Sequence, residues 1–158
     1  MNIVDSEQSP KNRAVDALKA TLNQLSAIKL RRIELDCPDP DVCIDIEAHV
    51  DVWGESHVLV CKVEESSHPV HVRTAIHELE NYAGRLTGNV IKVLIAPRIS
   101  AQALALCEQS RTSFLDLEGN ARLTLGEAFI VKRRLVKTAQ RTASSDSRRK
   151  VSQLAGAA

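Results

Sequence analysis

The chain has 158 residues, of which 44% are hydrophobic and 26% are charged, a composition typical of one globular domain with a substantial core. Only 3% are aromatic, so we expect an aliphatic core. No apolar run approaches the roughly 20 residues needed to cross a bilayer, and the first residues lack the pattern of a signal peptide. These features predict a cytoplasmic protein with no membrane partner.

Charge is unevenly distributed along the chain. Residues 1–131 carry 13 Lys and Arg against 19 Asp and Glu, a balance of −6, whereas residues 132–158 carry 8 against 1, a balance of +7. A basic tail on an acidic body favours a polyanionic partner, and a solvated tail that only maintains solubility is the alternative. We expect a flexible N-terminus over 1–9, a folded domain over 10–135 and a basic disordered tail over 136–158.

The first elements are a helix and two strands. Ser9 before Pro10 is typical of a helix start, and apolar residues at helical spacing predict a helix over 10–28. Mixed polarity over 30–36 predicts an edge strand. Strict alternation over 42–52 predicts a strand with one buried face. That face is made by Val42, Ile44, Ile46, Ala48, Val50 and Val52.

A hairpin turn over 53–56 leads into an apolar strand over 57–63. If the turn centres on Gly54 and Glu55, Glu47 faces Lys62 and Asp45 faces Glu64. These four side chains would then form one patch able to hold a divalent metal, with Lys62 polarising a nearby water. A plain cross-strand ion pair between Glu47 and Lys62 is the alternative interpretation.

The rest of the chain predicts further alternating helices and strands. A helix that starts near Pro69 and ends at Gly88 precedes a buried strand over 90–96. Ser100 caps a short helix, and short strands follow over 114–117, 121–125 and 129–131. The step from 57–63 to 90–96 should be a right-handed parallel crossover, giving a mixed sheet with helices packed against it.

Several chemically conspicuous residues are assigned structural roles. Cys61 and Cys107 lie in apolar surroundings and are expected to be reduced, small core residues. The segment 116–120 should be a tight turn in which Gly119 adopts an unusual φ and Asp116 or Asn120 bonds backbone amides. The histidines near the second helix are expected to be solvated or to cap it; they are His68, His71 and His77.

This order of elements, with Asp45 on one strand and Lys62 late on the next, resembles the PD-(D/E)xK nuclease superfamily. The likeness is greater to a bacterial branch of nuclease-like proteins, some of them similar to abortive-infection antitoxin regulators. It covers about residues 42–125. The matching segments are Val60-Cys61-Lys62, Pro69, Val72-Arg73-Thr74-Ala75-Ile76 with Leu79, Val93 to Pro97, Leu106-Cys107 and Leu115 to Leu123. The resemblance implies an α/β fold with a restriction-endonuclease-like αβββαβ core and a mixed central sheet.

By this resemblance Asp45 matches the metal-binding acid and Lys62 the catalytic lysine, while Val60 stands where the family has its second acid. A valine cannot hold Mg²⁺, so a weak or absent phosphodiesterase activity is implied. Glu47 or Glu64 could supply the missing oxygen, so the candidate metal ligands are Asp45, Glu47 and Glu64. Magnesium is expected only if the site is catalytic.

Three functions remain open at this point. The first is a DNA-associated or regulatory module with a degenerate site; the second is an active Mg²⁺-dependent endonuclease with a relocated acid. The third is an antitoxin-like protein-interaction module, which the resemblance would connect with bacterial defence. The choice between DNA and RNA stays open, as does a homodimer or another protein partner. Candidate phosphate contacts are Arg73, Lys132, Arg133, Arg134, Arg148, Arg149 and Lys150.

Overall fold

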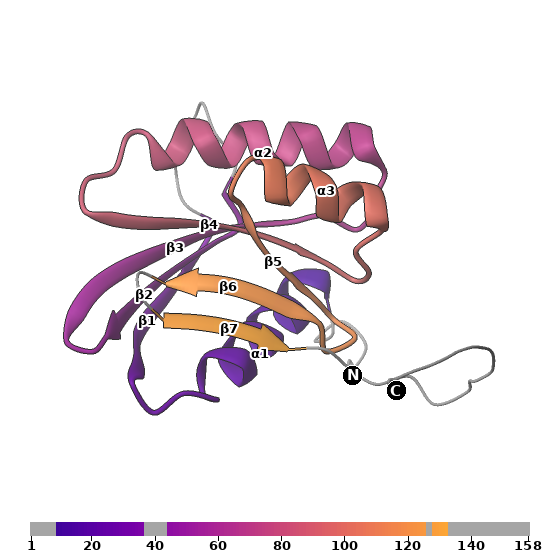
Figure 1. Ribbon diagram of the computed structural model, residues 1–158. Coiled ribbons are helices and arrows are strands. Elements are labelled where there is room, and N and C mark those ends of the chain that lie inside the picture. Colours follow the sequence, from indigo (N-terminus) through magenta and orange to yellow (C-terminus); the bar gives the residue numbers. More distant parts are fainter. Residues whose placement is uncertain (1–8, 37–43, 126–127, 133–158) are drawn as a thin grey trace, which may run out of the picture.

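The computed structural model describes residues 9–36, 44–125 and 128–132 (Figure 1). Within these ranges the order is helix, three strands, helix, strand, helix and short strands, as expected. The elements are α1 (Pro10–Leu22), β1 (Ile28–Leu35), β2 (Ile46–Val52), β3 (Glu55–Val63), α2 (Pro69–Ala83), β4 (Asn89–Ala96), α3 (Ala101–Gln109), β5 (Ser113–Asp116), β6 (Ala121–Leu125) and β7 (Ala128–Lys132). None of these helices is long and apolar enough to span a membrane.

Seven strands form one sheet in the order of the chain. β1, β2 and β3 are antiparallel to one another, β3, β4 and β5 are parallel, and β5, β6 and β7 are antiparallel. Figure 1 shows α2 and α3 on one face of the sheet and α1 on the other. The mixed α/β fold is therefore confirmed, including the parallel step from β3 to β4 through α2.

The core is aliphatic on both faces of the sheet. Under α1, Leu18 and Leu22 pack on Ile46, Val50 and Leu59 as part of one large cluster. Two smaller clusters lie on the opposite face, beneath α2 and α3. The described core therefore consists of three clusters of mainly aliphatic side chains, one under α1 and two on the opposite face of the sheet.

Both described cysteines are core residues, as expected. Cys61 lies in the cluster under α1 and Cys107 in a cluster on the opposite face, and neither is exposed to solvent. Burial raises the pKa of the Cys107 thiol to about 12, which keeps it protonated at neutral pH. These thiols serve packing rather than nucleophilic chemistry.

The β2–β3 hairpin turns one residue earlier than predicted. Trp53 and Gly54 both have positive φ, 49° and 85°, and form a two-residue turn between Val52 and Glu55. As a result, Glu47 pairs with Val60 rather than with Lys62. The predicted register was wrong because only the glycine was expected to adopt positive φ. The error is two residues, so each side chain still points to the face that alternation predicts.

The alternation of side chains between the two faces is interrupted in β1 and just before β2. A register shift between Leu30 and Arg32 lets Leu30 and Ile33 both pack toward α1, which turns Glu34 to the opposite face. Ile44 packs with the cluster under α2, whereas Ile46 packs under α1, so the alternation begins only with β2. The assignment of Ile44 to the face of Ile46 was therefore wrong.

Two helices are shorter than predicted. α1 ends at Leu22, six residues before the expected end, and Asn23 caps it. α2 ends at Ala83 with Gly84 as its cap, while Gly88 adopts positive φ just before β4. In both cases an apolar residue that follows the helix has helical spacing in the sequence but packs against the core from a loop. Leu25 contacts the cluster under α1, and Leu86 contacts a cluster under α2.

The turn between β5 and β6 is organised by a buried carboxylate. Asp116 is 3% exposed, and its Oδ1 accepts hydrogen bonds from the backbone N–H groups of Glu118 (2.9 Å) and Asn120 (2.8 Å). Its Oδ2 accepts a third from the Asn120 side-chain amide at 2.8 Å. Gly119 has φ 101°. The predicted structural turn is confirmed.

Substituting Asp116 with Ala should lower the free energy of unfolding by about 2–3 kcal/mol, because two backbone amides lose a charged acceptor. Urea unfolding of the full chain measures this. The control is Glu118→Ala, which removes only the exposed pair with Arg98 and should cost less than about 1 kcal/mol. Equal losses in the two variants would contradict the assigned role.

Candidate functional site

Asp45 lies immediately before β2 and is held by groups of the protein itself. Its Oδ2 accepts a hydrogen bond from the backbone N–H of Val63 at 2.7 Å. Its Oδ1 lies 3.7 Å from Nζ of Lys11 on α1, and Lys11 also pairs with Asp36. The carboxylate therefore joins β3 to α1, and its side chain is only 15% exposed.

Lys62 lies near the end of β3 and faces α2. Its Nζ lies 3.0 Å from Oε1 of Glu78, and the residue is 8% exposed. Two positions earlier on the same strand, Val60 is fully buried and packs with Ile44 and Leu79. The place of the expected second acid is thus an apolar contact between the sheet and α2.

Glu64, just after β3, connects Asp45 and Lys62 electrostatically. Burial is the main cause that raises the pKa of its carboxyl group; Lys62 and His71 lower the pKa, while Asp45 and Glu78 raise it. Because all four charges act on Glu64, these five residues share one neighbourhood, here named the Asp45–Lys62 site. The site contains three residues of the predicted patch, Asp45, Lys62 and Glu64.

Sequence reasoning missed two residues of this site. His71 and Glu78 lie seven positions apart on α2, a spacing that places them on the same helix face. His71 is exposed, as expected for a solvated histidine, but its effect on Glu64 was not foreseen, and Glu78 was given no role. The periodicity could have grouped them, but only the structure shows that this helix face lies over the end of β3.

The Asp45–Lys62 site does not fit the two-carboxylate Mg²⁺ site that the resemblance implies. Val60 offers no oxygen, and one oxygen of Asp45 already accepts the Val63 amide. Among the described residues, Asp45 belongs to no group of three metal-ligating side chains whose ligand atoms lie within 4.8 Å. Magnesium, which demands near-ideal oxygen coordination, lacks its expected ligands here.

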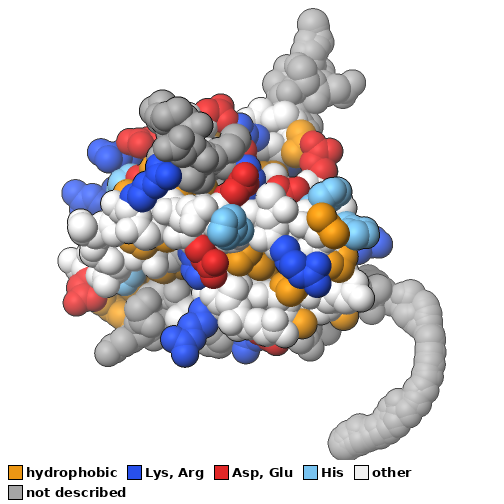
Figure 2. All heavy atoms as spheres, turned by 90° about the horizontal axis from the view of Figure 1, so that it is seen from above, with side chains coloured by type: hydrophobic (Ala, Val, Ile, Leu, Met, Phe, Trp, Pro, Cys, Tyr) orange, Lys and Arg blue, Asp and Glu red, His pale blue; other side chains and the backbone are white. Residues whose placement is uncertain are grey.

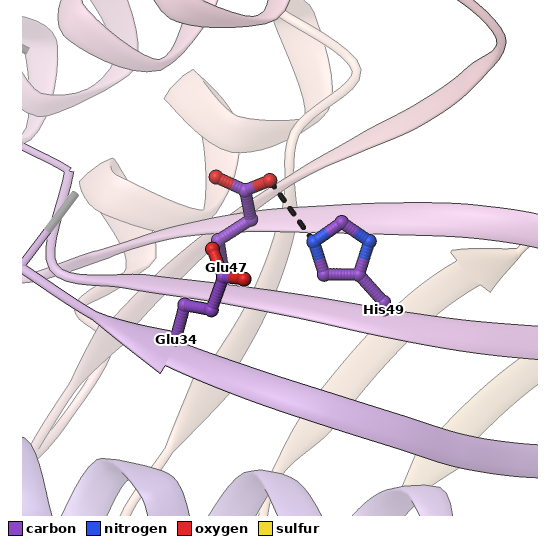
Figure 3. A group of neighbouring side chains, drawn as sticks. All are labelled: Glu34, Glu47 and His49. Carbon is purple, nitrogen blue, oxygen red and sulfur yellow. Dashed lines mark ion pairs between the residues drawn. The ribbon is translucent and has the colours of Figure 1, made fainter.

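Glu47 belongs to a different group, on the face of β2 that looks toward α2. Its Oε1 accepts a hydrogen bond from Oη of Tyr82 at 2.8 Å, and its Oε2 lies 3.1 Å from Nε2 of His49. Glu34 on β1 lies directly opposite Glu47 on β2 in the register of the two strands. Figure 3 shows the three labelled side chains reaching toward one another from these two strands. Their ligand atoms all lie within 4.8 Å of one another.

The residues predicted to contact phosphate are only partly described. Arg73 is exposed and lines a hollow between α2 and α3 with His77 and Leu106, apart from the Asp45–Lys62 site. The side chain of Lys132 and the other basic candidates lie outside the described residues; these are Arg133, Arg134, Arg148, Arg149 and Lys150. His68 caps α2 through Nδ1, as expected for a capping histidine.

The α2 side of the molecule shows no single basic patch among its described residues. In Figure 2 positive, negative and histidine side chains are interspersed over this face. The described charged side chains are largely paired, for example Lys92 with Glu80 and Arg122 with Glu108. The excess of positive charge in the sequence lies instead in residues 132–158.

Comparison with solved structures identifies the fold. A repair endonuclease from Pyrococcus abyssi aligns with a TM-score of 0.51 at 16% identity, over 73% of this chain and 47% of that one. An EndoMS–dsDNA complex aligns with 0.45 at 15% identity, over 66% and 45%. The chain has the restriction-endonuclease-like fold that this repair endonuclease also has. It spans about half the length of the repair endonuclease it matches.

An XisH family protein from Nostoc punctiforme PCC 73102 also aligns, with a TM-score of 0.48 at 16% identity, over 77% of this chain and 99% of that one. No family model and no curated protein sequence matches the chain. At these identities the likeness shows the fold alone, so the chemistry has to be argued from the side chains described above.

Glu64→Gln should stabilise the protein at neutral pH. Since burial raises the pKa of Glu64 in the folded state, the wild-type chain loses stability as pH rises from the unfolded value of about 4.5 through the folded one. The variant does not titrate, so its advantage should appear above that range and vanish below about pH 4.

Urea unfolding from pH 4 to pH 8 measures this difference. Glu65→Gln, which changes the adjacent exposed carboxyl, is the matched control. A difference between Glu64→Gln and the wild type that stays constant with pH would show that burial of Glu64 is not the cause.

Proposed function

We propose that this chain is a nuclease-fold protein that associates with DNA and has a degenerate phosphodiesterase site. The observation that carries the proposal is the buried Val60, which occupies the place of the second metal-binding acid and packs against Ile44 and Leu79. Phosphodiester cleavage by a metal-dependent nuclease depends on carboxylates that fix the ion against the scissile phosphate. One of the two is missing here.

The remaining site residues support the same conclusion. The carboxylate of Asp45 accepts the Val63 amide, and the ammonium group of Lys62 is paired with Glu78. A catalytic lysine of this kind acts by stabilising charge on phosphate or water, which an internal carboxylate partner opposes. Through these contacts, Asp45 connects β3 with α1, and Lys62 connects β3 with α2.

The charge of the C-terminal segment supports association with DNA. Residues 132–158 carry a balance of +7, which would attract a polyanion without regard to base sequence. The fold is shared with a protein described as a repair endonuclease. A fold permits several functions, so the DNA assignment depends on the tail rather than on the likeness.

A second candidate function is an active Mg²⁺-dependent endonuclease that uses Glu64 as the relocated acid. This candidate is supported by the effect of the charges of both Asp45 and Lys62 on the pKa of the Glu64 carboxyl group. Glu47 is a poorer candidate for this role because it pairs with Val60 and binds Tyr82 and His49.

Supercoiled plasmid incubated with the full chain and Mg²⁺ or Mn²⁺ should remain uncut, because the metal ligands are incomplete. Gel analysis should show no difference between the wild type, Lys62→Ala and Glu64→Gln. Nicking by the wild type that is abolished in both variants but kept in Glu65→Gln would establish the second candidate. Nicking that persists in Lys62→Ala would remove the Asp45–Lys62 site from the chemistry.

The full chain should bind a labelled DNA duplex with an affinity that falls steeply with salt and depends little on sequence. Replacing Arg148, Arg149 and Lys150 together by Ser should weaken binding and reduce the slope of log affinity against log salt by up to about 3. Fluorescence anisotropy measures both quantities. Arg98→Ser, a surface arginine paired with Glu118, is the control and should change neither. Unaltered binding by the triple variant would take these residues out of the interface.

A further inference from the structure

We propose that Glu34, Glu47 and His49 bind a divalent first-row transition-metal ion, in a site separate from the Asp45–Lys62 site. The inference does not depend on the proposed function, since it requires neither DNA nor cleavage. It follows from the positions of these three side chains on β1 and β2 (Figure 3).

The spacing of the ligand atoms suits one ion. Two ligands bound side by side to a metal at about 2.0–2.2 Å lie about 3 Å from each other. Oε2 of Glu47 and Nε2 of His49 are 3.1 Å apart. Glu34 completes the group within 4.8 Å, and its side chain is 49% exposed, so a change of rotamer can bring it closer.

The register of β1 and β2 places two negative charges opposite each other. Glu34 and Glu47 are direct cross-strand partners, and like charges in such positions destabilise a sheet. Arg32, which lies 3.1 Å from Glu34 through Nε, offsets part of this repulsion. That arginine is 63% exposed, so its contribution is screened by solvent. A bound cation would neutralise both carboxylates.

The imidazole of His49 supplies independent evidence. Its Nε2 is shielded from solvent and makes no hydrogen bond, although Oε2 of Glu47 lies 3.1 Å away. A buried polar atom without a hydrogen bond is costly. Coordination to a metal would satisfy the nitrogen, and a neutral imidazole is a common metal ligand.

Tyr82 orients the site from α2. Its hydroxyl donates to Oε1 of Glu47 at 2.8 Å, which leaves Oε2 directed toward His49. Such hydrogen bonds to a ligating carboxylate fix its geometry and raise metal affinity. A mixed set of one nitrogen and two carboxylates favours Mn²⁺, Fe²⁺ or Zn²⁺ over Ca²⁺ or Mg²⁺.

Manganese is the probe of choice, because it prefers oxygen and nitrogen ligands and avoids the thiols that would bind Zn²⁺. Metal-stripped full-length protein is titrated with Mn²⁺, and the electron paramagnetic resonance signal of the free ion reports binding. The wild-type protein should bind one equivalent of Mn²⁺, and its melting temperature should rise in the presence of the ion. His49→Gln and Glu34→Gln should each weaken binding tenfold or more.

Three controls separate this site from others. Asp51→Asn changes an acid of the same strand that pairs with Arg31, and it should alter affinity by less than about twofold. Asp45→Asn should also leave binding intact, because Asp45 belongs to the other site. Arg32→Gln should tighten binding about two- to fivefold, since the arginine competes with the ion for Glu34.

The proposal is overturned if Mn²⁺ binding does not saturate, if His49→Gln binds as tightly as the wild type, or if Asp45→Asn abolishes binding. Circular dichroism verifies that each variant folds. If His49→Gln fails to fold, Glu34→Gln decides the matter, because Glu34 is exposed and its substitution removes repulsion in the metal-free protein.

Discussion

The two-residue turn at Trp53 and Gly54 sets the register of β2 against β3, and the positions of the polar side chains depend on it. β2 pairs with β1 in a register of its own, which includes the shift between Leu30 and Arg32 and places Glu34 opposite Glu47. With Glu47 opposite Val60, its carboxylate contacts Tyr82 and His49. The turn and the irregularity in β1 together place Glu47 opposite both Val60 and Glu34.

Much of the architecture could be predicted from the sequence because apolar residues recur with a clear helical or strand spacing in most segments. The order of elements, the parallel step through α2 and the buried turn at Asp116 all follow from local patterns. The register could not be predicted, since it required positive φ at an aromatic residue. The irregularity in β1 could not be predicted either, because the sequence gives no clear sign of the shift between Leu30 and Arg32.

The site was only partly predictable. Asp45 and Lys62 follow from the resemblance, and Glu64 was one of two acids considered as a replacement. His71 and Glu78 depend on how α2 lies over the sheet, which is a tertiary property. The structure gives Val60 a packing role with Ile44 and Leu79. An acid in place of Val60 would thus bury an ionisable group in an apolar cluster, which is costly without a partner.

β1 forms one edge of the sheet, with β2 as its hydrogen-bonding neighbour. An open edge strand can recruit strands from other molecules and so begin aggregation. Here the strand combines an irregular register with charged side chains at Lys29, Arg31, Arg32 and Glu34. Both features are devices by which natural sheets resist intermolecular strand pairing. The residues that bring Glu34 to its position beside Glu47 thus also protect the sheet from lateral growth.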